Sequence, residues 1–482
     1  MVVGELATST DVLVIGGGPG GYAAALRVAE RGRSVTLVER DAVGGVCLNV
    51  GCIPSKTLIH VAETAALAHE AGSWGVDVSA EVDLARVGEH MDAVVGRLTG
   101  GVRQLLDGAG VTVVEGTARF SRADRAAVVH GEGVTHVEFS QAIVATGSRP
   151  VELAMLPFDG TRVIDSTAAL RLDRVPERLV VVGGGYIGLE LGTAWAKLGA
   201  QVTIVEAADR LLPGMAASLG RVVARRLRQL GVTVLTGTAA AGLDGPDLVV
   251  REVAGDDGDD DRTEHRLAAE VVLMAVGRRP NTDDLGLARV GVEVDGAGYI
   301  PVGPDRRAAP TILAIGDVTA GPALAHKATA EAEVAAATAC GEPAAFSPAA
   351  VPQVVFCDPE VVSVGVRPDG DRDGEDAAGA TAELTTFRFP FAANGRALSL
   401  GRDLGHAEIV ADAEGTVLGI HLVGPGVAEL AGEAALAVEM AATLEDVAGT
   451  IHAHPTLAEA IAEAAHGALG HPLHVRAPRH RD

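Results

Sequence analysis

Cysteine and aromatic residues are scarce in this sequence of 482 residues. It contains four cysteines, and aromatic residues make up only 3% of the chain. Four cysteines are too few for a secreted fold that is held together by disulfides. Because aromatic residues are so few, valine, leucine, isoleucine and alanine must build the core, which suits parallel strands covered by helices. The length exceeds what one core supports and predicts two to four domains.

Basic residues are also in deficit. Lysine and arginine total 39 against 64 aspartates and glutamates, which gives a net charge of −25. This balance argues against a nucleic-acid partner, because phosphates require a basic surface. No apolar run approaches the about 18 residues of a membrane span, so we expect no membrane insertion. The first residues lack the basic segment and apolar core of a secretory signal. We therefore expect a cytoplasmic enzyme, in which a reducible cysteine pair is more often catalytic than structural.

Two of the cysteines lie close together in residues 44–56, which read GGVCLNVGCIPSK. Cys47 and Cys52 are five positions apart, too far for a disulfide within a regular helix. We therefore expect Cys47 in a non-helical or distorted segment and Cys52 near the first turn of a helix. A helix N-terminus favours the thiolate, and Lys56 adds a nearby cation. The stretch predicts a redox-active dithiol, with two inert buried thiols as the alternative. A zinc site would need two more ligands nearby, and the sequence offers none.

Residues 11–39 have the pattern of a dinucleotide-binding unit: a strand, a glycine loop, a helix and a second strand that ends in an acid. In such a unit Gly16 permits the tight turn, Gly18 lets a pyrophosphate approach the backbone, and Gly21 lets the helix pack on the strand. Glu39 would accept hydrogen bonds from ribose hydroxyls.

The same unit occurs again at residues 179–206. The first glycine and the acid are 23 positions apart in both copies, 16 to 39 and 183 to 206. Two such units predict two dinucleotides, and with a dithiol between them a flavin and a nicotinamide are the natural pair. The carboxylate of Glu206 favours NAD over NADP. Arg210 is the type of residue that would bind the 2′-phosphate of NADP, so that alternative stays open.

Further strands are predicted at 111–117, 139–146 and 269–276. The turns ATGSRP and GRRPN that follow the last two would be exits between two nucleotide domains, with ordinary loops as the alternative. A strand at 312–317 ends in Asp317, a candidate ligand for a cofactor hydroxyl, and a helix is predicted at 323–340.

From about residue 351 short strands precede two helices, at 428–442 and 456–468, which predicts a separate α+β domain. Thr456 is the predicted N-cap of the second helix, and Glu459 follows it as in a capping box. A carboxylate at this position would also orient His454 as a general base. The acidic runs at 256–261, within a predicted β-meander, and at 369–376 are expected to be surface loops without chemistry.

These motifs resemble those of the flavin-dependent pyridine nucleotide–disulfide oxidoreductases, and most closely the branch that oxidises dihydrolipoyl groups. The resemblance runs from Asp11 to about His471 and rests on GGGPGGYAAA, GGVCLNVGCIPSK, ATGSRP, GGGYIGLELG, VGRRPN, AIGDVTAGPALAHKA, FAANGRA, HLVGPGVAELAGEAALA and HAHPTLAEA. It implies an α/β fold with two Rossmann-like nucleotide-binding domains and a C-terminal α+β dimerisation domain. The expected ranges are 1–149 and 277–349 for an FAD domain, 150–276 for an inserted NAD domain, and 350–482 for the interface domain.

The resemblance also implies roles for individual residues. Cys47 would meet the substrate and Cys52 the flavin. Lys56 would lie near the flavin and pair with Glu190. His454, oriented by Glu459, would be the acid–base, supplied by the other subunit of a homodimer. The implied FAD contacts are Gly16, Gly18, Gly21, Glu39, Lys56, Ala118, Thr146, Gly147, Ser148, Asp317, Ala323, Leu324, Ala325 and His326. The implied NAD contacts are Gly183, Gly185, Tyr186, Ile187, Gly188, Glu190, Glu206 and Gly277. No metal is expected, and Cys340 and Cys357 are expected to be buried thiols without a role.

The implied activity is oxidation of dihydrolipoyl groups to the lipoyl disulfide, with electrons passing through the Cys47–Cys52 dithiol and FAD to NAD⁺. The implied partner is a lipoyl-bearing acyltransferase or lipoyl carrier protein of a 2-oxoacid dehydrogenase or glycine cleavage complex. A quinone reductase of the diaphorase type, or another disulfide reductase of the family, is the alternative.

Other family branches fit less well. Mercuric reductases and large thioredoxin reductases need a C-terminal cysteine pair, whereas the last cysteine here is Cys357. Glutathione- and mycothiol-type reductases would prefer NADPH, against Glu206. A non-catalytic flavoprotein subunit is an alternative of another class, disfavoured by the complete set of catalytic residues.

Overall fold

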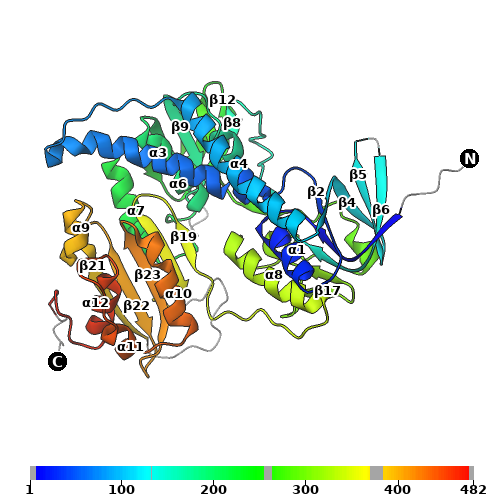
Figure 1. Cartoon of the computed structure of the whole chain (residues 1–482). Coiled ribbons are helices and arrows are strands. Elements are labelled where there is room, and N and C mark those ends of the chain that lie inside the picture. The colour runs from blue at the N-terminus through cyan, green and yellow to red at the C-terminus, as the bar shows by residue number, and fades with distance from the viewer. Residues whose placement is uncertain (1–6, 132, 254–262, 370–383, 477–482) are drawn as a thin grey trace, which may run out of the picture. The chain divides into compact units, whose positions relative to one another are not determined.

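The structure is a computed structural model that describes residues 7–131, 133–253, 263–369 and 384–476 (Figure 1). The acidic run at 256–261 and all but the first residue of the run at 369–376 lie outside the described residues. The chain forms two compact units. The first unit comprises Met1–Leu58, Asp83–Val151 and Arg278–Ser347, and the second unit comprises Ile59–Val82, Glu152–Gly277 and Pro348–Asp482.

A mostly parallel sheet forms the centre of the first unit. Its strands lie in the order β17-β18-β6-β1-β2-β3, and all neighbours from β18 to β3 are parallel. The bounds are β1 Ala7–Ile15, β2 Val35–Glu39, β3 Thr112–Glu115, β6 Gly133–Val144, β17 Arg307–Ala309 and β18 Ile312–Ala314. Residues 12–15 of β1 are all at most 3% exposed. Such a continuous apolar run is expected for a parallel strand that is covered on both faces.

Alternate residues of these strands pack in two separate cores. Val12 and Val14 face a core that includes residues of three helices, α1 (Pro19–Glu30), α4 (Leu84–Gly108) and α8 (Ala325–Ala339). Helices α1 and α8 lie side by side in Figure 1. Leu13 and Ile15 face the opposite core, which includes residues of the hairpin strands β4 (Thr117–Arg122) and β5 (Arg125–His130). Helix α4 was not predicted from the sequence.

The turns after β6 and after β15 (Val271–Met274) pair with each other in the first unit. The strands β7 (Ser148–Pro150) and β16 (Arg278–Pro280) are antiparallel, with Ser148 opposite Pro280. The two turns predicted as exits between nucleotide domains are therefore hydrogen-bonded neighbours.

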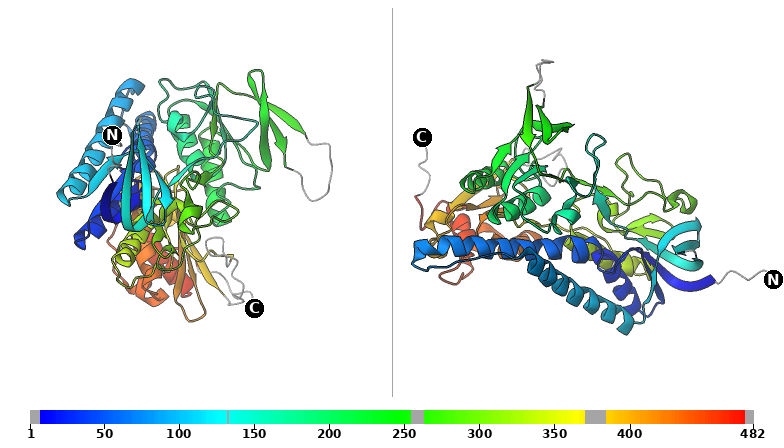
Figure 2. Two further views of the ribbon diagram at one scale, coloured as in Figure 1. Left: turned by 90° about the vertical axis from the view of Figure 1, so that its right-hand side faces the viewer. Right: turned by 90° about the horizontal axis from the view of Figure 1, so that it is seen from above.

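A second parallel sheet, in the order β11-β10-β9-β15-β8, lies in the second unit. Its strands are β8 Val163–Ile164, β9 Arg178–Val182, β10 Gln201–Val205, β11 Thr233–Leu235 and β15 Val271–Met274, and its helices are α5 Ser166–Ala169, α6 Tyr186–Lys197 and α7 Ala217–Gln229. An antiparallel meander follows, green in Figure 2, made of β12 Thr238–Asp244, β13 Asp247–Glu252 and β14 Glu264–Ala268. The predicted meander is confirmed.

The C-terminal part of the second unit is an antiparallel sheet covered by helices, as predicted (Figure 1). The strands, in the order β19-β20-β23-β22-β21, are β19 Gln353–Val355, β20 Glu360–Gly365, β21 Thr385–Pro390, β22 His406–Ala411 and β23 Val417–Gly424. The helices are α9 Gly395–Ser399, α10 Ala431–Glu439, α11 Leu444–Gly449 and α12 Glu459–Ala468. Short 3-10 helices occur at Ala71–Trp74, Leu287–Val290, Gly316–Val318, Phe391–Ala393 and Val427–Leu430.

Replacing Phe389 with alanine should destabilise the C-terminal part of the second unit. The Phe389 side chain is 1% exposed within the core between this sheet and α10–α12, so its removal leaves a cavity. We expect a loss of about 3–5 kcal/mol, measured by denaturant unfolding. Leu398→Ala is the control, because Leu398 is 54% exposed and its loss should cost less than about 0.5 kcal/mol. Equal losses in both variants would contradict this core.

Candidate functional site

Three predicted cofactor residues follow three neighbouring parallel strands of the first unit. Gly16 follows β1, Thr146 follows β6, and Asp317 follows β18. Because the carboxyl ends of parallel strands meet at one edge of a sheet, these residues gather at that edge. Ser148 donates a hydrogen bond to Asp317 at 2.5 Å, and Arg278 Nε donates to Ser148 Oγ at 2.7 Å. The edge therefore has the arrangement of a ligand site in an open α/β sheet.

The first glycine loop is sterically tight at two positions and open at a third. A Cβ on Gly16, whose φ is +103°, would lie 2.2 Å from the carbonyl oxygen of Ala145. A Cβ on Gly21 would lie 1.8 Å from the carbonyl oxygen of Gly16. A Cβ on Gly18 would meet nothing nearer than Gly45 Cα at 4.0 Å. The space in front of Gly18, at the N-terminus of α1, is where a pyrophosphate would approach the backbone.

The second glycine loop repeats this geometry in the second unit. A Cβ on Gly183 would lie 2.3 Å from the Ala275 carbonyl oxygen, and one on Gly188 would lie 2.0 Å from the Gly183 carbonyl oxygen. Among the described residues, apart from its chain neighbours, no atom lies within 4 Å of a Cβ on Gly185. Two other implied NAD contacts, Tyr186 and Ile187, open helix α6, and Gly277 follows β15 by three residues.

An acid at the end of the second strand supports each glycine loop. Glu39 accepts the backbone N–H of Gly17 at 2.5 Å, and Glu206 accepts that of Gly184 at 2.6 Å. The other oxygen of Glu39 accepts the N–H of Asp41 at 2.8 Å, and the other oxygen of Glu206 accepts the N–H of Ala208 at 2.7 Å. Both acids therefore lie beside their glycine loops, where ribose hydroxyls are bound in such units. Arg210 donates to the carbonyl of Pro213 at 3.0 Å.

The redox stretch consists of two helices. Cys47 lies within the short helix α2 (Gly45–Val50), and Cys52 is the first residue of α3 (Cys52–Glu70). The prediction that Cys47 lies in a non-helical or distorted segment is therefore wrong. The break that lets the cysteines meet falls at Gly51, with φ −134° and ψ −107°. A Cβ there would lie 2.9 Å from the Val46 carbonyl oxygen.

Both cysteines are in the thiol form and are not joined by a disulfide, with Cys47 half-buried and Cys52 exposed. Cys47 donates a hydrogen bond to Cys52, and this bond, burial and the charge of Cys52 raise the pKa of Cys47. The charge of Lys56 acts in the opposite direction. The raised pKa of Cys47 therefore favours the protonated form of this thiol.

The redox stretch packs directly on the first glycine loop. The N–H of Gly44 donates to the carbonyl of Gly17 at 2.8 Å. A Cβ on Gly45 would lie 2.6 Å from Gly18 Cα. The backbone that carries the cysteines thus lies against the predicted FAD loop.

A buried carboxylate that was not predicted fixes the turn that carries Asp317. Glu331 on α8 is 0% exposed and accepts the N–H of Gly316 at 2.6 Å. It also pairs with Arg306 at 2.9 Å and with Lys327 at 3.2 Å. One carboxylate therefore compensates two largely buried cations and holds the turn after β18.

The remaining implied FAD contacts lie around this edge or in the core. Gly147 accepts the N–H of Asn281 at 2.9 Å. Ala118 is a buried residue of β4. The others form the turn into α8, whose N-cap is Leu324: Ala323, Leu324, Ala325 and His326.

In the second unit, His454 and Glu459 meet as predicted. His454 Nδ1 lies 2.9 Å from Glu459 Oε1, and the His454 side chain is 77% exposed. Glu459 Oε2 accepts the N–H of Thr456 at 2.8 Å. The prediction that Thr456 caps the last helix is wrong, because α12 begins at Glu459 and the Thr456 hydroxyl donates to the Ala453 carbonyl. Glu459 therefore both orders the turn before α12 and orients the imidazole.

The segment that carries His454 is held on its other side by His452. The two ring nitrogens of His452 lie 2.9 Å from the Thr450 carbonyl and 2.7 Å from Glu433 Oε1. The His452 side chain is only 8% exposed. His454 is therefore the exposed imidazole of the two.

Glu190 lies on α6 and is 4% exposed. Its Oε1 accepts the N–H of Phe356 at 3.0 Å. Lys56 belongs to the first unit and Glu190 to the second, so their pairing stays a prediction. The same holds for the approach of His454 to the cysteines.

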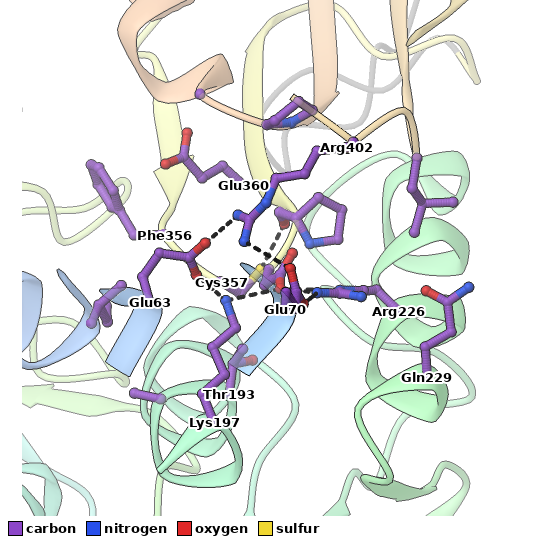
Figure 3. A pocket seen from close by; sticks show the side chains of 18 of the residues that line it. Glu63, Glu70, Thr193, Lys197, Arg226, Gln229, Phe356, Cys357, Glu360 and Arg402 are labelled. Carbon is purple, nitrogen blue, oxygen red and sulfur yellow. Dashed lines mark hydrogen bonds and ion pairs between the residues drawn. The ribbon is translucent and has the colours of Figure 1, made fainter. Parts of the chain in front are cut away.

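A cavity of about 610 Å³ in the second unit was not predicted from the sequence (Figure 3). Helices α3, α6 and α7 contribute to its lining, together with residues 356–360 and 401–404. Cys357 lines it as a buried thiol that donates to the Pro359 carbonyl at 3.3 Å, and burial and then the charge of Glu190 raise its pKa. The prediction that Cys357 is buried is confirmed. Cys340 is the C-cap of helix α8 and is only half-buried, so the prediction that it is a buried thiol is wrong.

Comparison with protein families gives two adjacent matches. Residues 10–332 match the pyridine nucleotide-disulphide oxidoreductase family, and residues 351–465 match the dimerisation domain of the same family. The chain belongs to the pyridine nucleotide–disulphide oxidoreductases. Members of this family of enzymes use FAD and NAD, and the two glycine loops with their open central glycines fit two such dinucleotides.

Relatives within this family match over nearly their whole length. A dihydrolipoyl dehydrogenase of Halobacterium salinarum is 47% identical, over 98% of this chain and 99% of that protein. A dihydrolipoyl dehydrogenase of Geobacillus stearothermophilus is 45% identical, over 98% and 99%. Among solved structures, LpdA of Mycobacterium tuberculosis has a TM-score of 0.84 at 29% identity and covers 95% of this chain and 99% of its own. No described helix is long and apolar enough to cross a membrane.

Replacing Gly185 with alanine should weaken NAD⁺ binding without affecting the fold. The added methyl group meets no protein atom but occupies the space where this family places a pyrophosphate. We expect the KM for NAD⁺ to rise about tenfold or more, with FAD content and thermal unfolding unchanged. Gly188→Ala is the matched control, because its methyl group collides with Gly183 and should lower stability. An unchanged KM in Gly185→Ala would place NAD elsewhere.

Proposed function

We propose that this chain oxidises dihydrolipoyl groups to the lipoyl disulfide, with NAD⁺ as the electron acceptor. The hydrogen-bonded thiol pair that packs on the first glycine loop carries the proposal. The names of the full-length relatives supply the substrate class.

The residues that would hold the two cofactors lie at the edges of two parallel sheets. FAD would bind at Gly18, Glu39, Thr146, Ser148, Asp317 and the start of α8. NAD would bind at Gly185, the first turn of α6, Glu206 and Gly277. When bound, FAD accepts two electrons from the dithiol and NAD⁺ receives them in turn. We also propose the domain ranges given above, which are supported by the breaks between the two units at 151/152, 277/278 and 347/348.

Thiol–disulfide exchange at Cys47 would begin the reaction. One substrate thiolate attacks Cys47 Sγ of the Cys47–Cys52 disulfide, and Cys52 leaves as a thiolate. The second substrate thiolate then attacks the substrate sulfur of the mixed disulfide. This attack closes the lipoyl disulfide and releases Cys47, which takes up a proton. The substrate is thereby oxidised by two electrons and the cysteine pair is reduced by two.

The geometry of the thiol pair supports different roles for its members. The raised pKa of Cys47 favours its protonated form, so a negative charge on the reduced pair would reside on Cys52. Cys52 begins helix α3, where the free N–H groups and Lys56, one turn further along, stabilise a thiolate. Cys52 is therefore both the better leaving group and the electron-rich member of the pair.

His454 would remove the substrate's thiol protons. Its Nδ1 is engaged by Glu459, which leaves Nε2 of the exposed ring for a substrate thiol. Burial raises the pKa of Glu459, but hydrogen bonds from Thr456 and His454 lower it overall. Glu459 thus remains a carboxylate and holds the imidazole in one tautomer.

The proposed assembly is a homodimer in which His454 serves the cysteines of the other subunit. The matched dimerisation domain, which includes His454 and Glu459, supports it. A lipoyl-bearing acyltransferase or lipoyl carrier protein in the cytoplasm is the proposed partner, supported by the relatives' names.

Cys52→Ser should abolish NAD⁺ reduction by dihydrolipoamide, because exchange at Cys47 needs the disulfide. NADH oxidation with a quinone should persist, since it does not require the dithiol. Both rates are read at the absorbance of NADH. Strong quinone turnover with negligible dihydrolipoamide turnover in the unaltered protein would instead favour a diaphorase-type reductase.

His454→Gln should lower dihydrolipoamide oxidation by about 10²–10⁴-fold, the contribution of a positioned general base. Glu459→Gln should have a smaller effect in the same direction, because the imidazole remains but loses its carboxylate. His466→Gln is the control: His466 belongs to the same helix as Glu459, contacts His471 and has no role in the proposed chemistry. A normal rate in His454→Gln would exclude His454 as the base.

A further inference from the structure

The loop between β19 and β20 is attached to one face of helix α6 at two points. The N–H of Phe356 donates to Glu190 at 3.0 Å, and Lys197 Nζ lies 2.8 Å from Asp358 Oδ2. Glu190 and Lys197 are seven residues apart, which is about two helical turns, so they lie on the same side of α6. The loop therefore spans this face, with one attachment at Glu190 and the other at Lys197.

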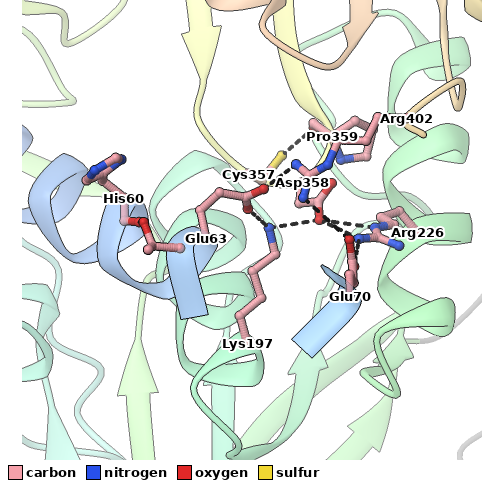
Figure 4. Close-up of polar contacts among 10 residues, drawn as sticks. His60, Glu63, Glu70, Lys197, Arg226, Cys357, Asp358, Pro359 and Arg402 are labelled. Atoms are coloured by element: carbon pink, nitrogen blue, oxygen red, sulfur yellow. Dashed lines mark hydrogen bonds and ion pairs between the residues drawn. The ribbon is translucent and has the colours of Figure 1, made fainter. Parts of the chain in front are cut away.

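Asp358 belongs to a closed ring of six alternating charges on the wall of the cavity, which we call the charge ring (Figure 4). Each of its three carboxylates pairs with two of its three cations. The pairs are Glu63 with Lys197 and Arg402, Asp358 with Lys197 and Arg226, and Glu70 with Arg226 and Arg402. Both Nε and Nη2 of Arg226 lie 3.0 Å from Asp358 Oδ2.

The members of the ring differ in burial. The Lys197 and Asp358 side chains are 5% and 14% exposed, whereas Glu70 is 39% exposed. Burial raises the pKa of Asp358, but the charges of Lys197 and Arg226 lower it overall. Removing one partner of a buried ion pair leaves a buried charge uncompensated, which is more costly than losing an exposed pair. The Asp358 end of the ring is therefore the end that holds the loop.

We propose that Asp358 is a positioning residue for Glu190. Its ion pairs with Lys197 and Arg226 fix the loop so that the Phe356 N–H engages the Glu190 carboxylate. The thiol of Cys357 donates to the Pro359 carbonyl within the same loop. Because this short segment is bonded internally, a shift of Asp358 also moves the Phe356 N–H. The proposal rests on the proposed function, in which Glu190 lies beside the cofactors.

Asp358→Asn tests this link, because it keeps the shape of the side chain and removes its charge. We expect the KM for NAD⁺ to rise about threefold to tenfold and the KM for dihydrolipoamide to stay the same. The long-wavelength absorbance of the anaerobically reduced holoenzyme should change as it does in Glu190→Gln. The double variant Asp358→Asn/Glu190→Gln should be no worse than Glu190→Gln alone, since both act through one carboxylate.

Two results would overturn the proposal. One is an Asp358→Asn protein with the KM and spectrum of the unaltered enzyme. The other is a double variant whose defect equals the product of the two single defects, because independent sites add in free energy.

Three further variants separate positioning from folding. Lys197→Arg keeps the cation and should behave like the unaltered enzyme, whereas Lys197→Met should reproduce Asp358→Asn and replaces it if that protein does not fold. Arg251→Ala removes an exposed ion pair with Glu264 elsewhere in the second unit and should change nothing.

If the unaltered enzyme does not oxidise dihydrolipoamide, the proposed function fails. The absorbance comparison of Asp358→Asn with Glu190→Gln still decides the link to Glu190.

Discussion

The close approach of helix and strand at the two glycine loops is the constraint on which both proposed nucleotide sites depend. A Cβ on Gly21 or Gly188 would lie about 2 Å from a carbonyl oxygen of the strand end, so neither position accepts any side chain. This packing aims the first N–H groups of α1 and α6 at the space in front of Gly18 and Gly185. The same tight turn puts Gly17 and Gly184 within reach of Glu39 and Glu206. In each proposed site, the close contact between helix and strand end therefore determines where the phosphate and the ribose of the nucleotide would lie.

Carboxylates hold several of the predicted site residues in place, which gives some of the many acidic residues a structural use. Glu331 holds the Asp317 turn, Glu459 holds the imidazole of His454, and Asp358 holds the loop that reaches Glu190. In each case the acid accepts hydrogen bonds from the backbone or from a cation, and such bonds are stronger than those between neutral groups. These acidic residues therefore fix backbone turns and side chains within the fold.

Local patterns allowed the sequence to predict both glycine units, with the acids Glu39 and Glu206 beside their loops. The predictions from local patterns were wrong where a single residue changes the direction of the chain or the partner of a hydrogen bond. Five-residue spacing correctly excludes one regular helix through Cys47 and Cys52, but it does not show that Gly51 alone breaks the chain and leaves Cys47 helical. Thr456 has the residue type of an N-cap, yet its hydroxyl bonds to Ala453 instead. The charge ring has no local pattern at all, because its members come from five separate segments that only the tertiary fold brings together.

The two units carry different groups of the proposed reaction, the thiol pair and the imidazole. The first unit holds the thiol pair against the FAD loop, and the second holds the exposed imidazole on the segment before α12. That segment is part of the matched dimerisation domain and is tied down on both sides, through His452 and through Glu459. His454, the proposed base, is thus firmly held with its ring open to solvent, and it needs a thiol delivered to it from outside its own segment. The dimerisation domain would then serve catalysis directly, since pairing two chains is what would bring a held base to a held thiol pair.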